Sequence, residues 1–175
     1  MRTCTLATCL AVIGSLATVA IATAQDATTG CSVEHSSNAT EILRCRGAVT
    51  IIAEDGAKFT LQGRNKNGAI NAVALQDKAV LIDVGKQQDK RRFEVITPQA
   101  IAAVRGTKWA VDAQQTRTSV LVLRGQVAVR RPAGAGQVVL GPGQGVDIDA
   151  GTTDPLIVKT WPQARVTALL ARLGQ

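Results

Sequence analysis

Apolar and polar residues alternate with a period of two through much of this chain, and this pattern constrains its fold more than any other feature. Successive side chains of a β-strand point to opposite faces of a sheet, so alternation predicts strands with one buried and one solvated face. The clearest alternating stretches are 58–62, 93–97, 107–112, 127–130 and 146–149. Three further runs are more continuously apolar than the alternating stretches and predict strands covered on both faces: 49–52, 79–84 and 120–123.

Turn-forming residues separate these runs at intervals of about 8–12 residues. The turn signals are Asp55-Gly56, Asn67-Gly68, Gly85, Arg124-Gly125, Gly134-Ala135-Gly136 and Gly141-Pro142-Gly143. We therefore expect an all-β fold with about ten short strands in two packed or rolled sheets. The pattern leaves a closed barrel, a sandwich and an open roll as alternatives.

One segment near the end of the chain has helical spacing instead. Beyond Trp161-Pro162, an apolar stripe repeats at i, i+3, i+4 and i+7, formed by Val166, Leu169, Leu170 and Leu173. This spacing predicts one short C-terminal amphipathic helix. A helix of about 12 residues is marginal alone in water. It is therefore expected either to pack on the sheet or to dock on a partner.

The first 24 residues have the three parts of a secretory signal. Arg2 supplies a positive start, the stretch 6–22 is apolar and uncharged, and Ala22-Thr23-Ala24 is a cleavage site before Gln25. Glycine and serine interrupt the apolar stretch, so we expect a cleaved signal, with an uncleaved anchor as the alternative. No second apolar run of about 18 residues follows, and no stable membrane span is expected after cleavage.

The cysteines agree with export. Cys31 and Cys45 remain after the signal is removed. Two cysteines close together in an exported chain most simply form one disulfide, which is worth about 3 kcal/mol in the chain-entropy model. A lipid-modified Cys31 is the alternative, although the residues before it depart from the lipidation pattern. A metal site is not expected, because two thiols and one distant histidine, His35, do not complete a tetrahedral shell.

The chain is basic, with a formal net charge of +7, of which Arg2 contributes one. Its one dense cluster is Lys90-Arg91-Arg92, and Arg130-Arg131 is a weaker pair. Such a balance either keeps a small domain soluble or attracts an anionic partner. Nucleic acid is not expected as the partner, because the aromatic residues are too few and too dispersed to stack bases.

The residue inventory argues against an enzyme, and we expect no catalytic residue, no metal and no cofactor. His35 lacks a nucleophile and a carboxylate in a triad pattern. Asp147 and Asp149 share one strand face, where solvation is expected rather than cation binding. The segment 141–145 is rich in glycine, but it lacks the Lys-Ser/Thr of a phosphate loop and is expected to be a turn.

From Phe93 onward the chain resembles the FecR family of exported domains. The resemblance is carried by the runs 93–98, 104–107, 109–111, 120–129 and 140–145. It includes Thr97-Pro98, then Arg105-Gly106-Thr107, Trp109 and Gly125, in the order and spacing of that family. It covers 93–148 clearly and 45–92 more weakly, while 25–44 and 150–175 have no match.

The resemblance implies a β-rich periplasmic domain that binds protein. The best-known members are membrane-spanning regulators of iron uptake that control a sigma factor, whereas this sequence shows a cleavable signal and no cytoplasmic segment. We therefore expect no direct control of a sigma factor. The expected divisions are 1–24, a cleavable signal; 25–44, a polar lead with the first half of the disulfide; 45–150, the FecR-like domain; and 151–175, a linker and helix.

The sequence thus predicts an exported, non-enzymatic binding or regulatory module that acts in the periplasm, or as a secreted protein, through contacts with an envelope protein. The alternative is a basic structural or adhesive module that holds an anionic envelope polymer. Arg105 is a candidate binding residue because an arginine held by a bend suits bidentate contacts. Lys90, Arg91 and Arg92 are candidates because they form the dense basic cluster. The family motif residues are expected to be structural: Thr97, Pro98, Gly106, Thr107, Trp109 and Gly125. The sequence does not predict an oligomeric state.

Overall fold

A computed structural model describes residues 30–36, 40–64, 68–85, 92–134 and 136–175. The predicted signal peptide, Asn67, Lys90 and Arg91 lie outside these residues. The described strands are β1 (Cys31–His35), β2 (Glu41–Cys45), β3 (Val49–Ala53), β4 (Lys58–Arg64), β5 (Ile70–Val84), β6 (Phe93–Ile96), β7 (Ile101–Val104), β8 (Lys108–Ala113), β9 (Arg117–Arg124), β10 (Val127–Arg130), β11 (Gln137–Leu140), β12 (Gln144–Asp149) and β13 (Lys159–Thr160). They are followed by the helix α1 (Gln163–Arg172).

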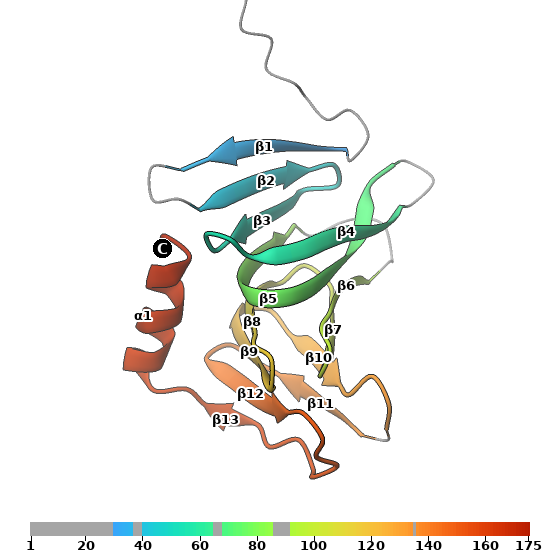
Figure 1. Cartoon of the computed structure of the whole chain (residues 1–175), viewed down its shortest axis with the longest axis vertical. Coiled ribbons are helices and arrows are strands. Elements are labelled where there is room, and N and C mark those ends of the chain that lie inside the picture. Colours follow the sequence, from blue (N-terminus) through green and yellow to red (C-terminus); the bar gives the residue numbers. More distant parts are fainter. Residues whose placement is uncertain (1–29, 37–39, 65–67, 86–91, 135) are drawn as a thin grey trace, which may run out of the picture.

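The strands form two packed layers that share one long strand (Figure 1). The first half of β5 pairs with β4 and β6, and its second half pairs with β3 and β8. The order in one layer is β1-β2-β3-β5-β8-β9-β12-β13, and the order in the other is β4-β5-β6-β7-β10-β11. At the transition Lys78 has a φ of 65°, in the left-handed region. The predicted all-β fold of packed or rolled sheets is confirmed.

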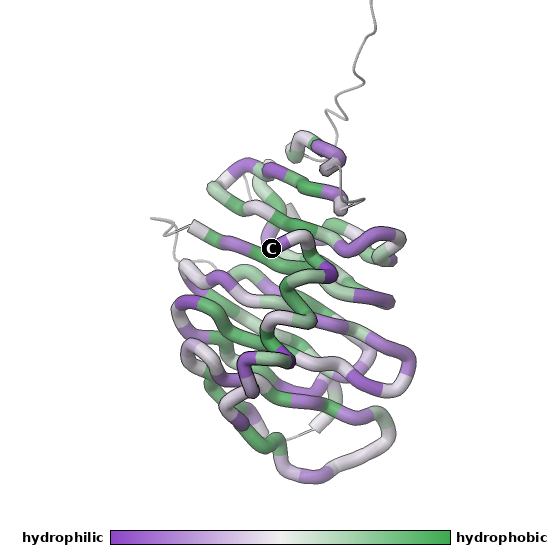
Figure 2. Tube along the Cα trace, turned by 90° about the vertical axis from the view of Figure 1, so that its left-hand side faces the viewer, coloured by the Kyte–Doolittle hydropathy of each residue, from purple (hydrophilic) through white to green (hydrophobic). Residues whose placement is uncertain are grey.

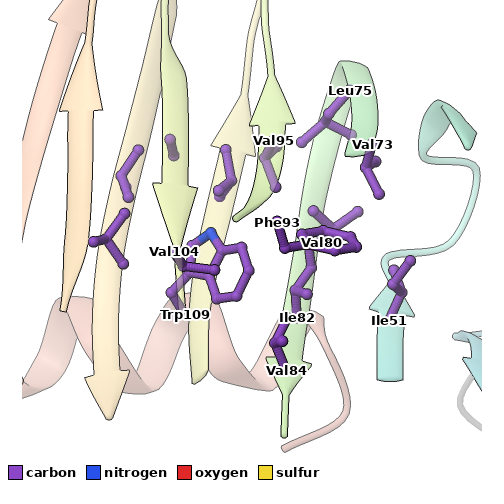
Figure 3. Packing of buried hydrophobic residues seen from close by; sticks show 14 of the residues in the cluster. Ile51, Val73, Leu75, Val80, Ile82, Val84, Phe93, Val95, Val104 and Trp109 are labelled. Atoms are coloured by element: carbon purple, nitrogen blue, oxygen red, sulfur yellow. The ribbon is translucent and has the colours of Figure 1, made fainter. Parts of the chain in front are cut away.

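The core lies between the two layers and is built mainly from aliphatic side chains. Trp109 on β8 is fully buried at its centre, and Phe93 on β6 meets it edge to face with ring centroids 6.0 Å apart (Figure 3). Val80, Ile82, Val95 and Val104 lie around this pair in the same cluster. Alternate residues of most strands point into this core, as the period-two pattern predicts.

The predicted C-terminal helix is confirmed and covers the outer face of the first layer. It runs across the strands (Figure 2), and Leu169 and Leu173 bury against Leu81 and Leu121. This explains why 79–82 and 120–123 are apolar on both faces, since one face meets the core and the other meets α1. Asp83, further along β5, pairs instead with Arg124. In β3 the burial alternates instead, so the run 49–52 is only partly covered on its outer side.

Two arginines fasten α1 to the sheet. Arg165 donates to Asp147 on β12 at 2.6 Å, and its guanidinium carbon lies 3.5 Å from the centroid of the Trp161 ring. Arg172 donates to Glu54 at 2.7 Å and to Asp112 at 2.8 Å. The hydrogen bonds that Arg172 donates to Asp112 and Glu54 raise its pKa above the ordinary value. The helix is thus held by charge as well as by its apolar stripe.

The predicted disulfide between Cys31 and Cys45 is confirmed. The two residues face each other across the β1–β2 pair, with their Cα atoms 3.9 Å apart. This bond closes the N-terminal hairpin, which extends the first layer beyond β3.

Candidate functional site

The turn between β7 and β8 presents Arg105, the arginine predicted to make binding contacts. Gly106 has a φ of 57°, which allows the sharp bend. The Thr107 hydroxyl lies 3.0 Å from the Arg105 carbonyl and 3.1 Å from the Gln126 carbonyl, so it ties this turn to the one between β9 and β10. A side chain at Gly125 would put its Cβ 2.8 Å from the same hydroxyl. The motif residues therefore build the support under Arg105.

Arg105 and Arg92 line one surface hollow of about 320 Å³. We call it the arginine groove, and the residues that line it are Arg92, Ala103, Val104, Arg105, Gln126, Ala128, Gln137 and Val139. Both arginines are exposed. Two of the four predicted binding residues, 13 positions apart in the sequence, thus meet at one site, while Lys90 and Arg91 fall outside the described residues.

The floor of the arginine groove is a row of small or apolar side chains on the outer face of the second layer. The register places Ala103 opposite Ala128, and Ala128 opposite Val139. Alanine side chains are short, so they leave a hollow between the longer residues at the rim. Val139 is 53% exposed on the edge strand β11. The floor therefore offers apolar contact next to the two positive charges.

The groove combines chemistry that suits an acidic partner with an apolar contact. Among its described lining residues the charged groups are both guanidinium groups, and two glutamines supply neutral donors and acceptors. Guanidinium groups bind carboxylates with two parallel hydrogen bonds, which gives both strength and orientation. An arrangement of this kind can bind an acidic surface, but it contains no nucleophile or general base.

The other motif residues have structural contacts. The Thr97 hydroxyl accepts a hydrogen bond from the Ala100 amide at 2.9 Å, closing the turn that begins at Thr97-Pro98. It also lies 2.9 Å from the Thr118 hydroxyl, which donates to the Gln99 side chain at 2.8 Å. These polar groups are buried and satisfy one another, as buried polar groups must. They join the β6–β7 turn of the second layer to strand β9 of the first layer.

The residues considered for chemistry are placed apart or already paired. His35 is exposed on the edge strand β1. Asp147 accepts from Arg165 and from the Ser119 hydroxyl, and Asp149 accepts from Arg117. Burial would raise the pKa of Asp147, but its hydrogen bonds with Arg165 and Ser119 outweigh burial and hold the pKa below its ordinary value.

The described part of the chain contains no group of three or more residues able to hold a metal ion. Within the same residues, no helix has the length and apolar character needed to cross a bilayer. Residues 141–143 form the turn between β11 and β12, as predicted, while Gln144 and Gly145 already belong to β12.

Sequence reasoning missed how the parts of the arginine groove converge. Arg92 precedes β6, Arg105 follows β7, and the floor comes from β7, β10 and β11. The sequence contained one indication of this convergence. If two successive alternating stretches pair as antiparallel strands, the start of the first lies beside the end of the second. The pairing order itself could not be deduced from spacing.

Residues 55–128 match the family model described as FecR protein. No curated protein matches the chain in sequence. Two crystal structures of a candidate anti-sigma factor from Parabacteroides distasonis are similar to it, with TM-scores of 0.60 and 0.61 and 18% identity in both cases. The matches cover 79% and 80% of this chain, which spans 64% of the length of those chains. At this identity the likeness concerns the fold. Residues 55–128 thus match the FecR family model, and the chain shares the fold of these two crystal structures.

Proposed function

We propose that this chain is an exported, non-enzymatic binding and regulatory module of the FecR type that acts in the periplasm through contacts with an envelope protein. The observation that carries the proposal is the arginine groove, where Arg92 and Arg105 stand beside the exposed Val139. The family motif supports it, because Gly106, Thr107 and Gly125 hold the turn that presents Arg105.

The groove favours a protein partner because it offers two kinds of contact within a small area. A partner with an acidic side chain beside an apolar one gains a charge-assisted hydrogen bond and also covers the alanine floor. The apolar contacts with the alanine floor depend little on salt, whereas contacts with the arginines alone weaken as ionic strength rises. The similar crystal structures are described as an anti-sigma factor, which is consistent with a regulatory role.

The second candidate is a module that holds an anionic envelope polymer. It is favoured by the basic balance of the chain, whose net charge of +7 includes one charge from Arg2 in the signal, and by the exposure of Arg92, Arg105 and Arg130. A polymer bound by charge alone would be released steeply as salt increases. Ionic strength therefore separates the two candidates.

The test is capture of partners from an envelope extract by the immobilised chain at low and at high salt, followed by mass spectrometry. We compare the parent chain with Arg92→Ala/Arg105→Ala and with the charge-matched control Arg44→Ala/Arg46→Ala, which changes exposed arginines at the N-terminal hairpin. The proposal predicts one protein that persists at high salt and is lost only from the groove variant. Capture of polymer alone, lost at high salt and equally reduced in both variants, would support the second candidate instead.

Export is part of the proposal and has its own test. We propose that the signal 1–24 is removed, that 25–44 leads into the domain over 45–150, and that 151–175 forms the linker and helix. N-terminal sequencing of the chain recovered from the periplasm should begin at Gln25. Retention of the intact N-terminus in the membrane fraction would support an uncleaved anchor.

A further inference from the structure

The outer face of the second layer has an apolar centre that no described helix or strand covers. α1 packs on the first layer, on the opposite side of the molecule (Figure 1). The side chains of the uncovered face alternate with core residues such as Val95 and Val129 and therefore point outward. The strand register arranges them in two neighbouring rows, which we call the second-layer face: Ala72, Glu94, Ala103, Ala128 and Val139 in the first row, and Ala74, Ile96, Ile101, Arg130 and Gln137 in the second.

The centre of the second-layer face suits apolar contact. Ile96 and Ile101 lie opposite each other on β6 and β7, and both are partly exposed. Ala103 and Ala128 lie beside them at the floor of the arginine groove, where short side chains leave a hollow for larger side chains of another molecule. Exposed apolar surface that is rimmed by polar groups is typical of interaction sites.

Two arginines stand on opposite sides of these alanines. Arg92 precedes β6 and lines the arginine groove, while Arg130 follows Ala128 on β10 and ends that strand. Both are exposed, and among the described residues neither guanidinium group pairs with a carboxylate. The described hydrogen bond of the Arg130 side chain goes to the Arg131 carbonyl, at 3.3 Å. The border of the face therefore carries positive charge that an acidic partner can neutralise.

The first layer shows how this molecule covers a sheet face of the same kind. There α1 packs Leu169 on an apolar centre, and its arginines bond carboxylates at the border. Arg165 pairs with Asp147, and Arg172 pairs with Asp112. In that pair of surfaces the sheet supplies acidic groups and the helix supplies basic ones. The second-layer face has the same apolar centre with the opposite charge at its border.

We propose that the second-layer face binds an amphipathic helix of the partner protein, which lays its apolar stripe between Ile101 and Val139 and places acidic side chains on Arg92 and Arg130. Amphipathic helices bind grooves in this way, with apolar anchors one turn apart. The helix belongs to the envelope protein of the proposed function, so the proposal rests on that function and adds the kind of segment that is recognised.

The spacing of the two arginines fits one side of a helix. Arg92 and Arg130 are separated by two strand spacings and by four positions along the strands, which amounts to roughly 16 Å. Helical residues about 11 positions apart span this distance and return to the same side after about three turns. The two acidic residues of the partner helix are therefore expected at about this spacing.

Other occupants fit this face less well. A second copy of α1 carries Arg165 and Arg172 and no acidic residue, so its charges would meet Arg92 and Arg130. On an anionic bilayer, Glu94 would face headgroups of its own charge, and the hollow over the alanines would not be filled. An acidic protein helix fills the hollow and pairs with both arginines.

The first experiment maps the bound segment by photo-cross-linking in living cells. A photoreactive amino acid is placed at Ile101 or at Val139, and the cross-linked positions of the captured protein are read by mass spectrometry. We expect both sites to capture one acidic segment, at positions related by the helical intervals i+3, i+4 or i+7. Positions that alternate along the segment would indicate a strand and overturn the proposal. A lipid product from Ile101, or a product with a second copy of this chain, would do the same.

The second experiment measures capture of that protein from envelope extract by variants of the whole chain. Ile101→Asp puts a carboxylate against the acidic helix, and Arg130→Ala removes one ionic contact without disturbing the core. Each should weaken capture by about tenfold or more. Ile157→Asp and Arg46→Ala change exposed residues elsewhere and should leave capture unchanged.

Failure of the helix proposal can be told apart from failure of the proposed function. If Ile101→Asp and Arg130→Ala capture the protein normally, while Arg92→Ala/Arg105→Ala loses it, the arginine groove is a binding site and the helix proposal is wrong. If neither Ile101 nor Val139 cross-links to any protein, the proposed function fails together with the helix proposal.

Discussion

Arg172, in the last turn of α1, is bonded to Glu54, which lies 118 residues earlier in the chain. The same guanidinium bonds Asp112, and the two carboxylate side chains are only 18% and 11% exposed. The C-terminal helix and the β3–β4 turn are therefore joined through one arginine. The first prediction follows from this arrangement.

Replacing Arg172 by alanine should lower the free energy of unfolding by about 1–3 kcal/mol, because it leaves two partly buried carboxylates without their partner. Urea denaturation measures this change. Arg124→Ala is the control, because Arg124 pairs with Asp83 on the surface and exposed pairs contribute at most about 1 kcal/mol. Equal losses of unfolding free energy in the two variants would show that the bonds of Arg172 to Glu54 and Asp112 contribute no more stability than an exposed ion pair does.

Stability should fall in acid partly because of Asp147. Its folded pKa lies below its ordinary value, through the hydrogen bonds with Arg165 and Ser119. A carboxyl with a depressed folded pKa stabilises the fold above its unfolded pKa, near 3.9, and this stability is lost as the pH falls through the folded value. Asp147→Asn should therefore be less stable at neutral pH and should lose less stability below about pH 4. If the variant and the parent chain lost the same free energy of unfolding as the pH falls below about 4, Asp147 would not be a source of the acid sensitivity.

Gly145 has no room for a side chain beneath Trp161. A Cβ there would lie 2.3 Å from the Trp161 Nε1 atom and 2.7 Å from the Val120 carbonyl oxygen. Gly145→Ala should destabilise the chain by about 1–3 kcal/mol by displacing Trp161 and the start of α1. Gly141→Ala is the control, because its Cβ would meet only the flexible Gln144 side chain, at 3.4 Å. Tryptophan fluorescence and urea denaturation together report both the displacement and its cost.

Opening the disulfide should act on the β1–β2 hairpin before it affects the rest of the fold. Cys31 and Cys45 close a short loop, which is worth about 3 kcal/mol in the chain-entropy model. Because most of β1 is exposed, Cys31→Ser/Cys45→Ser should increase hydrogen exchange in β1 and β2 while β5 and β8 keep their protection. Global unfolding of this variant at neutral pH would show that the hairpin is needed by the whole core.

Much of the fold could be predicted from local patterns. Alternation placed strands such as 93–97 and 127–130, and the stripe through Leu169 and Leu173 placed the helix. The length of β5 could not be predicted, because Gln76, Asp77 and Lys78 are polar residues that resemble a turn in the sequence. They lie where the strand passes from one layer to the other, and their environment is set by β4 and β8 rather than by their neighbours in sequence.

The candidate site was predicted in part. A bend at Gly106 indicated that Arg105 would be presented at the surface, and the cluster that ends at Arg92 indicated positive charge. Their convergence depends on the pairing of β6 with β7 and of β7 with β10, which places the two arginines at the same hollow. Pairing over such distances is decided by the packing of the whole core, and no local pattern contains it.

The most direct measurement of the central claim is photo-cross-linking in living cells from the floor of the arginine groove. A photoreactive amino acid at Val139 should form one cross-linked product with an envelope protein, and Arg92→Ala/Arg105→Ala in the same chain should abolish it. The same amino acid at Ile157, which is 63% exposed on the C-terminal linker, should form no such product. An identical product from both positions, or one that survives loss of both arginines, would contradict a binding site at the arginine groove.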